Sequence, residues 1–382
     1  MTGSAEGRDP RPYSLDIPQA DLDDLARRLA ATRWPDVQGG DDWSAGAAFP
    51  SLRAIQQYWL DDYDWRAQEA RLNDFPQYLA EVDGLDIHFF HVPAKGGKGV
   101  PLLLLHGWPG SQVEYIDLIG PLTDPLGHGC PDAMAFDVVI PAIPGFGFGG
   151  KPREAGWGVD RIAAVFATLM VDVLGYPRFG VQGGDWGTII GRRMAQNHAD
   201  RVAALHINMP YAYPPPDAEQ PQAWQDFHRA GTAYLGLQGT IPDAIAIGQS
   251  DSPMGLAGWI LEKFAIWSDC GQDLAAGIPL DALITNLMFY WLPNSAASAA
   301  RIYLESAREG KLPFGGDRID VPTGVAAFAA EPYLAPRAWV EPAYNVIRWA
   351  DFPKGGHFAA LEQPQALLGE IRAFFPAAGL RG

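Results

Sequence analysis

Apolar positions at helical spacing mark the first part of the chain. Leucines with Asp and Arg between them predict a surface helix over residues 18–33. A second helical stretch, residues 52–73, is rich in Tyr and Trp, and aromatic residues at this spacing usually serve packing. Residues 77–92 instead predict two strands, because the dipeptide Asp83-Gly84 between them favours a tight hairpin turn.

The middle of the chain repeats a pattern of short apolar strand, loop and helix. Each predicted strand ends in a loop rich in Gly or Pro; the strands are residues 100–106, 136–143, 179–182 and 203–208. Such alternation is typical of a mainly parallel sheet that is covered by helices on both faces. The predicted fold class is therefore α/β.

A long helical segment interrupts this rhythm. Residues 211–318 have a helical pattern rich in Tyr, Trp, Leu and Ala, and they show no strand signal. Strands return at residues 321–328 and 346–349, and a last helix is predicted over residues 363–375. A helical block between strands of one sheet predicts a lid over the edge where active sites of such sheets form.

Composition and charge limit the classes of protein that fit this pattern. The 382 residues are 48% hydrophobic and 19% charged, which is a globular composition. The net charge of −17 argues against nucleic acid or an anionic membrane as a partner, because both would repel the protein. No apolar run approaches the roughly 20 residues of a membrane span, and residues 1–14 lack the apolar core of a secretory signal. With only two cysteines, Cys130 and Cys270, we expect a cytoplasmic protein without a membrane anchor.

The sequence Gly183-Gly-Asp185-Trp-Gly187 lies between a predicted strand and a predicted helix. It matches the G-x-S-x-G nucleophile elbow, with Asp185 in the position that serine usually takes. The elbow is so tight that the residues two before and two after the nucleophile must be nearly free of side chains, and both are glycine here. Asp185 is therefore the candidate nucleophile.

Two further loops have the content that such a nucleophile needs. The loop His106-Gly-Trp108-Pro-Gly110 follows a predicted strand, where this architecture places one backbone N–H group of an oxyanion hole. Trp108 and Trp186 are thus the candidate oxyanion donors. Of the 8 histidines, only His357 lies in a Gly-rich loop after a late strand. The order of nucleophile, acid and histidine along the chain matches the α/β-hydrolase fold.

Five carboxylates between the predicted lid and His357 could be the acid that orients it: Asp317, Asp320, Glu331, Glu341 and Asp351. Glu331 lies just past the carboxyl end of the strand 321–328, on the edge where active sites of parallel sheets form. Asp320 lies at the opposite end of that strand. Asp351, a few residues before His357, remains an alternative to Glu331.

A carboxylate nucleophile restricts the reaction. A carboxylate that attacks a saturated carbon leaves an ester, which a water activated by histidine can hydrolyse. A serine in the same position would leave an ether, which water does not readily cleave. Asp185 thus indicates the opening of an epoxide or the displacement of a halide. An epoxide oxygen needs a proton donor such as a lid tyrosine, whereas a halide needs N–H donors.

No cofactor or metal is expected. Residues 145–150 match the letters of a dinucleotide fingerprint, but Lys151-Pro152 follows where a helix would have to begin. His88 and His91 are three apart on a predicted strand, so they face opposite sides and cannot hold one metal together. The enzyme would need only water besides its substrate.

Short motifs spread over residues 13–375 carry a family resemblance. They are WRAQEARLN (65–73), DGLDIH (83–88), HGWPGS (106–111), QGGDWG (182–187), DSPMGL (251–256), LEKF (261–264) and GGHFAALE (355–362). Together they resemble the microsomal-type epoxide hydrolases, a family with an N-terminal extension ahead of an α/β-hydrolase core and a helical lid. The resemblance implies an extension over residues 1–92, core segments at 93–210 and 319–382, and a lid at 211–318.

The same resemblance implies a role for each site residue. Asp185 would be the nucleophile, His357 the base and Glu331 the acid that orients it. Tyr234 and Tyr303 in the lid would donate hydrogen bonds to the epoxide oxygen. The extension would wrap the core and brace the lid. The expected reaction adds water to a small apolar epoxide and releases a vicinal diol, through an ester on Asp185.

Two other functions fit the same residues. A haloalkane or haloacid dehalogenase uses the same chemistry of Asp, His and a second acid, although the tyrosine pair and the N-terminal extension argue against it. A non-catalytic ligand-binding protein on a hydrolase fold is the second alternative, but such a protein usually lacks a member of the triad. The sequence leaves the oligomeric state open, a homodimer included, and does not separate detoxification from secondary metabolism. Its high content of Ala, Gly, Pro and Arg favours a bacterial source.

Overall fold

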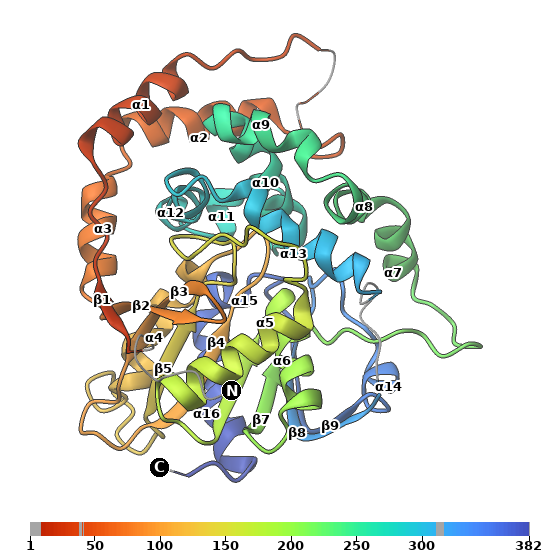
Figure 1. Cartoon of the computed structure of the whole chain (residues 1–382). Coiled ribbons are helices and arrows are strands. Elements are labelled where there is room, and N and C mark those ends of the chain that lie inside the picture. Colours follow the sequence, from red (N-terminus) through yellow and green to blue (C-terminus); the bar gives the residue numbers. More distant parts are fainter. Residues whose placement is uncertain (1–8, 38–39, 41, 311–316, 382) are drawn as a thin grey trace.

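The computed structural model describes residues 9–37, 40, 42–310 and 317–381, and a 9-stranded sheet organises them (Figure 1). Residues 1–8 of the predicted extension, with most of the segment tested for a signal, and residues 311–316 of the predicted lid lie outside this description. The strands are β1 (Arg11–Tyr13), β2 (Gln77–Val82), β3 (Leu85–Val92), β4 (Val100–Leu105), β5 (Phe136–Pro141), β6 (Phe179–Gly183), β7 (Val202–Ile207), β8 (Ile319–Phe328) and β9 (Tyr344–Phe352). The sheet is mainly parallel, as predicted.

The order of the strands along the sheet changes direction at β4. It reads β1-β2-β3-β5-β4-β6-β7-β8-β9, so β4 lies between β5 and β6. β1, β2 and β3 are antiparallel, with the predicted hairpin between β2 and β3, and the strands from β5 to β9 are parallel. The chain order reverses at β4, and open parallel sheets bind ligands outside the carboxyl ends of the strands at such a point.

Helices cover both faces of the sheet. A Cβ atom on Gly180 of β6 would lie 2.6 Å from the ring of Phe375 in α16 (Pro364–Ala377). The next residue, Val181, instead lies against Gly191 of α6 (Trp186–Asn197). Because adjacent strand residues point to opposite faces, α16 and α6 cover opposite faces. α4 (Ile116–Thr123) packs beside α16, and α5 (Val159–Thr168) packs beside α6.

A helical lid lies between β7 and β8 in the sequence and above the carboxyl edge of the parallel strands in Figure 1. It contains α7 (Gln222–Asp226), α8 (Ala233–Thr240), α9 (Asp243–Asp251), α10 (Pro253–Trp267), α11 (Leu274–Gly277), α12 (Leu280–Trp291) and α13 (Ala296–Arg308). α10 is buried over most of its 15 residues, as expected of a helix that is apolar on nearly all sides. In the described part of the chain no helix is both long and apolar enough to cross a membrane.

The N-terminal extension contains α1 (Gln19–Ala30), α2 (Phe49–Asp61) and α3 (Trp65–Asn73). The prediction of one helix over residues 52–73 is wrong, because α2 ends at Asp61 and α3 begins at Trp65. Asp64 between them has an extended backbone, and its side chain accepts a hydrogen bond from the Ala67 N–H at 3.2 Å. An aspartate that caps a new helix N-terminus in this way favours a break in the chain over a continuous helix.

The extension contacts the lid as well as the sheet. Its strand β1 pairs with β2, while α1 and α2 pack against α10. The hydroxyl of Tyr58 donates a hydrogen bond to Asp281 of α12 at 2.9 Å, and the hydroxyl of Tyr63 lies 2.9 Å from that of Thr285 on the same helix. Arg28 of α1 forms an ion pair with Asp251 of α9 at 2.7 Å. The extension thus runs from the edge of the sheet over the outer side of the lid (Figure 1).

Candidate active site

Asp185 occupies a sharp turn between β6 and α6. Its φ of 49° and ψ of −127° lie in a region that residues other than glycine rarely adopt. A Cβ atom on Gly187 would collide with the backbone of Leu105 in β4, and one on Gly183 would collide with the backbone of Gly187. The turn therefore depends on these two glycines, as the elbow motif predicts. It holds the Asp185 carboxylate at the carboxyl edge of the sheet.

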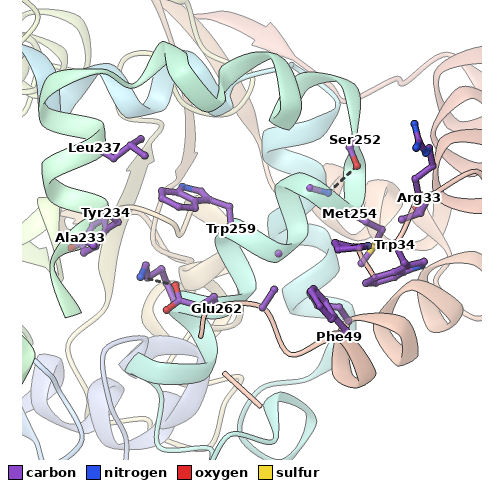
Figure 2. Close-up of a pocket in the computed structure, with 18 residues that line it drawn as sticks. Arg33, Trp34, Phe49, Ala233, Tyr234, Leu237, Ser252, Met254, Trp259 and Glu262 are labelled. Atoms are coloured by element: carbon purple, nitrogen blue, oxygen red, sulfur yellow. Dashed lines mark hydrogen bonds and ion pairs between the residues drawn. The ribbon is translucent and has the colours of Figure 1, made fainter. Parts of the chain in front are cut away.

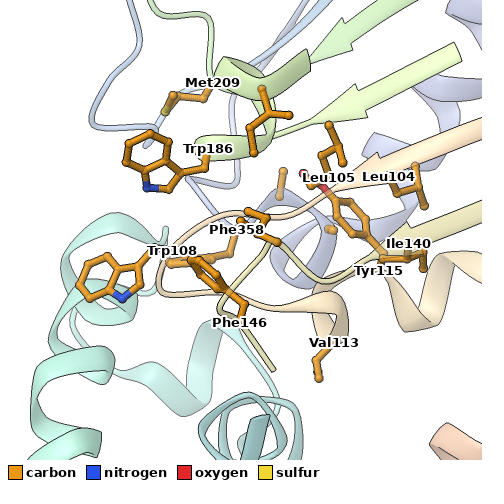
Figure 3. Close-up of a cluster of buried hydrophobic side chains, with 14 of the residues drawn as sticks. Leu104, Leu105, Trp108, Val113, Tyr115, Ile140, Phe146, Trp186, Met209 and Phe358 are labelled. Carbon is orange, nitrogen blue, oxygen red and sulfur yellow. The ribbon is translucent and has the colours of Figure 1, made fainter. Parts of the chain in front are cut away.

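A backbone N–H group and a helix N-terminus lie beside the Asp185 carboxylate. The Trp108 N–H, in the loop after β4, donates a hydrogen bond to Asp185 Oδ1 at 2.7 Å. A Cβ atom on Gly107 would collide with the same carboxylate, so this loop can approach it closely only with glycine there. Trp186 is the first residue of α6, where the helix dipole favours negative charge. Figure 3 shows the indoles of both tryptophans at one end of a buried apolar cluster, away from Leu104 in the sheet.

His357 lies between two carboxylates. Its Nδ1 atom is 2.9 Å from Glu331 Oε2 and 3.1 Å from Glu331 Oε1, and its Nε2 atom is 3.4 Å from Asp185 Oδ2. Glu331, in the turn after β8, also accepts a hydrogen bond from the Tyr333 N–H at 2.9 Å. Asp351 instead accepts a hydrogen bond from its neighbour Trp349 at 2.8 Å. The structure therefore brings Asp185, His357 and Glu331 together and pairs Asp351 elsewhere.

The charge of His357 follows from these neighbours. Burial by itself lowers the pKa of this imidazole, but the negative charges of Glu331 and Asp185 outweigh burial and hold the pKa well above its usual value. His357 is therefore an imidazolium at neutral pH in the absence of substrate. Any change that removes the charge of Asp185 or Glu331 would lower this pKa.

The side chains of Tyr234 in α8 and Tyr303 in α13 extend from the lid to the tryptophans beside Asp185. The Tyr234 ring stacks on Trp108 with centroids 5.2 Å apart, and the Tyr303 ring meets Trp186 edge-on at 4.7 Å. The centroids of the two tyrosine rings are 5.9 Å apart. Burial raises the pKa of both phenols well above the usual 10, so both keep their protons in the working range of an enzyme. The Tyr303 hydroxyl is buried.

Sequence reasoning missed two residues that contact Tyr234. The Tyr333 hydroxyl lies 2.8 Å from the Tyr234 hydroxyl, and Tyr333 is close to Glu331 in the sequence. The ammonium group of Lys263 lies 4.9 Å over the Tyr234 ring and forms an ion pair with Glu262 at 2.6 Å. Lys263 belongs to the LEKF segment that carries part of the family resemblance, which was the one available signal.

Glu114 is a further acidic group near Asp185 that the sequence analysis did not single out. Burial and the nearby charge of Asp185 raise the pKa of Glu114, although His357 lowers it, and the result is about 8. Its carboxyl group lies so close to Gly110 that a Cβ atom there would collide with it. Its position shortly after the HGWPGS segment, within otherwise uncharged residues, was the signal that could have identified it. Glu114 is therefore mostly protonated at neutral pH.

Two features of the sequence were weighed as a metal or a dinucleotide site, His88 with His91 and the loop at residues 145–150. The described residues contain no cluster of three or more His, Cys, Asp or Glu side chains that could hold a metal ion. His88 lies instead between Gln77 and Gln112, with which it forms hydrogen bonds of 3.0 and 3.1 Å. The loop at residues 145–150 is followed by no helix until α5 begins at Val159, so it lacks the helix N-terminus that a pyrophosphate needs.

Family models and known proteins that match this chain agree with the geometry of the site. Residues 10–115 match the family model described as epoxide hydrolase N terminus, and residues 100–240 match that of the alpha/beta hydrolase fold. A putative epoxide hydrolase of Stigmatella aurantiaca is 42% identical over 374 residues, which are 95% of this chain and 84% of that protein. Epoxide hydrolase 1 of Oryctolagus cuniculus is 34% identical and matches 95% of this chain and 88% of its own length.

Solved structures give the same result. The epoxide hydrolase of Aspergillus niger has a TM-score of 0.85 and 30% identity, with 97% of both chains covered. The juvenile hormone epoxide hydrolase of the silkworm Bombyx mori has a TM-score of 0.84 and 28% identity, with 97% of this chain and 94% of that one covered. The elbow, the lid and the sheet define an enzyme of the α/β-hydrolase fold. Within that fold the chain belongs to the epoxide hydrolase family, so the resemblance seen in the sequence is confirmed.

Proposed function

We propose that the protein hydrolyses apolar epoxides to vicinal diols through an ester on Asp185. One observation carries the proposal: the Asp185 carboxylate lies 3.4 Å from His357, and the rings of two lid tyrosines pack against Trp108 and Trp186 beside it. A carboxylate can open an epoxide by attack on carbon, and a histidine can activate the water that cleaves the resulting ester. The family membership of the chain supports the same reaction.

In the first step, a carboxylate oxygen of Asp185 bonds to one epoxide carbon and the C–O bond at that carbon breaks. The electron pair stays on the epoxide oxygen, which takes a proton from Tyr303 or Tyr234. Tyr333 can donate its own proton to the Tyr234 hydroxyl, so that Tyr234 donates towards the epoxide. The His357 imidazolium then returns a proton to the tyrosine.

The second step begins with a change of charge. The ester on Asp185 is neutral, so one of the two charges that raise the pKa of His357 has disappeared. The neutral imidazole takes a proton from a water molecule, which attacks the ester carbonyl carbon. The N–H groups of Trp108 and Trp186 stabilise the oxyanion. The tetrahedral intermediate then breaks its bond to the diol oxygen, which takes the proton of the hydroxyl group that came from water. The diol leaves, and the Asp185 carboxylate and the His357 imidazolium are restored.

The reaction class is tested by diol formation from a panel of aryl and alicyclic epoxides. We expect diol from the wild-type protein and no chloride release from 1-chlorohexane. Chloride release without diol would instead support a dehalogenase, and neither product, over a broad panel, would support a ligand-binding protein.

Removal of the lid hydroxyls should slow ring opening. We expect Tyr303→Phe and Tyr234→Phe each to lower the rate of ester formation about 10²-fold, because general acid catalysis typically contributes about 10²-fold to 10⁴-fold. The double variant should lose about 10⁴-fold. Rapid-mixing tryptophan fluorescence measures this step. Tyr58→Phe, a tyrosine that bonds to Asp281 away from the site, is the matched control. Wild-type rates in the double variant would contradict the assigned role.

Loss of the charge of Glu331 should affect both the rate and its pH dependence. We expect Glu331→Gln to slow ester hydrolysis on the order of 10³-fold, because His357 loses the partner that orients it. Hydrolysis requires neutral His357, and the Glu331 charge raises the pKa of His357. The inflection of the hydrolysis rate against pH should therefore move to lower pH in the variant. Asp351→Asn is the matched control, and an effect of that variant equal to Glu331→Gln would reverse the assignment.

We also propose where in the cell the protein works and what it binds. A cytoplasmic location fits the two cysteines, Cys130 and Cys270, which are both free thiols in the structure. The net charge of −17 favours a small uncharged substrate over nucleic acid or an anionic membrane. A homodimer is compatible with these features.

A further inference from the structure

A cavity of about 570 Å³ lies between the N-terminal extension and the lid. Trp34, Phe49 and Leu52 line it from the extension, and Leu237 and Trp259 line it from the lid. Figure 2 shows Trp34 and Phe49 on one side of the view and Leu237 on the other, with Trp259 between them. The extension therefore supplies one wall of a cavity whose other wall belongs to the lid.

The cavity adjoins the candidate active site at one residue. Tyr234, which the proposed mechanism uses as a proton donor, is one of the lining residues. Its ring stacks on Trp108, and the Trp108 N–H holds the Asp185 carboxylate. The Trp259 ring also lies within 6.3 Å of the Trp108 ring, measured between centroids. A substrate held by Tyr234 would thus have this cavity directly beside it.

The chemistry of the lining favours an uncharged, apolar occupant. Most of the lining surface comes from aromatic and aliphatic side chains. Three charged residues also line the cavity. Glu262 and Lys263 form an ion pair of 2.6 Å with each other, and Arg33 is exposed at the surface. The volume lies in the range of about 300 to 1,000 Å³ that is typical of small-molecule sites, and it exceeds what an epoxide ring alone would fill.

The geometry points to a substrate-tail site in this cavity, where an extended apolar substituent of the epoxide binds. The N-terminal extension determines how long that substituent can be. This inference rests on the proposed function and adds the substrate class: epoxides with a long hydrocarbon tail. Each methylene group of the tail that leaves water should raise kcat/KM about fourfold until the cavity is full.

A series of terminal epoxides with unbranched tails tests the inference. Diol formation is measured for 1,2-epoxybutane, 1,2-epoxyhexane, 1,2-epoxyoctane and 1,2-epoxydecane. For the wild-type protein we expect kcat/KM to rise at least about 10²-fold from the shortest to the longest. Ala47→Phe places a ring in the cavity from the extension and should lower this ratio about tenfold or more. Ala45→Phe, two residues away, exposed and outside the lining, should keep the wild-type ratio.

The possible outcomes distinguish a failure of the tail-site proposal from a failure of the proposed reaction. A wild-type ratio near one, or the same ratio in Ala47→Phe, would overturn the tail site while leaving epoxide hydrolysis intact. If Ala47→Phe does not fold, Leu237→Phe fills the cavity from the lid and is judged by the same ratio. If the wild-type protein hydrolyses no epoxide, the proposed function is overturned, and calorimetric binding of 1,2-decanediol against 1,2-butanediol judges the tail site. Preference for decanediol that Ala47→Phe removes supports the site; equal binding overturns it.

Discussion

Replacement of Asp185 by alanine should lower diol formation by at least about 10⁴-fold. The proposed reaction forms its covalent bond at this carboxylate, and removal of a nucleophile from a catalytic triad typically costs on the order of 10⁴-fold to 10⁶-fold. No other described carboxylate is placed to substitute, because Glu331 is on the far side of His357 and Glu114 is mostly protonated. The variant should also fold, since alanine removes the only charged group from a buried turn.

Steady-state diol formation from one aryl and one aliphatic epoxide measures this loss. Asp200→Ala is the matched control, because Asp200 is an exposed aspartate whose side chain has a relative accessibility of 79%. We expect the control to keep wild-type activity. If Asp185→Ala keeps even a tenth of the wild-type rate, Asp185 is not the nucleophile.

The second large effect concerns His357. We expect His357→Gln to lower steady-state turnover about 10⁴-fold, because the ester on Asp185 would lose the base that activates water. Ring opening depends on Asp185 and the tyrosines, so ester formation should continue, more slowly, with solvent returning the proton to tyrosine. The ester should therefore accumulate to one equivalent per protein chain.

Intact mass measurement detects this accumulation directly. Protein incubated with styrene oxide should gain the mass of one epoxide, and peptide mapping should place the added mass on Asp185. His128→Gln is the control, because His128 is exposed on the surface of the α/β-hydrolase segment. This variant should turn over normally without gaining mass. A variant that is inactive but gains no mass would contradict this expectation, because ester formation would then require His357.

The core of the fold was predictable because local sequence patterns determine its strands and its sharp turn. Buried parallel strands show as short apolar runs, and the elbow around Asp185 needs glycines at fixed positions, where the structure has them. The rule that active sites form at the carboxyl ends of parallel strands favoured Glu331 over Asp320, and Glu331 is the residue that contacts His357. The contact with His357 also favours Glu331 over Asp351 as the acid, a choice that the sequence left open.

Other features depend on contacts that no local pattern records. The break between α2 and α3 was missed because aromatic residues continue across it, whereas the cap formed by Asp64 decides the structure. Tyr333 and Lys263 contact Tyr234 only through the packing of the lid on the core. The cavity wall formed by the extension likewise requires two distant segments to meet.

In the proposed mechanism, Asp185 itself supplies an oxygen atom to the diol. It is tested by a single turnover in water labelled with ¹⁸O, with enzyme in excess over epoxide. We expect that the diol from this first turnover carries no label, since one oxygen comes from the epoxide and the other from the Asp185 carboxylate. The label should appear in the Asp185 peptide instead. Labelled diol from the first turnover, with an unlabelled Asp185 peptide, would mean that water attacks the epoxide directly and would contradict the mechanism.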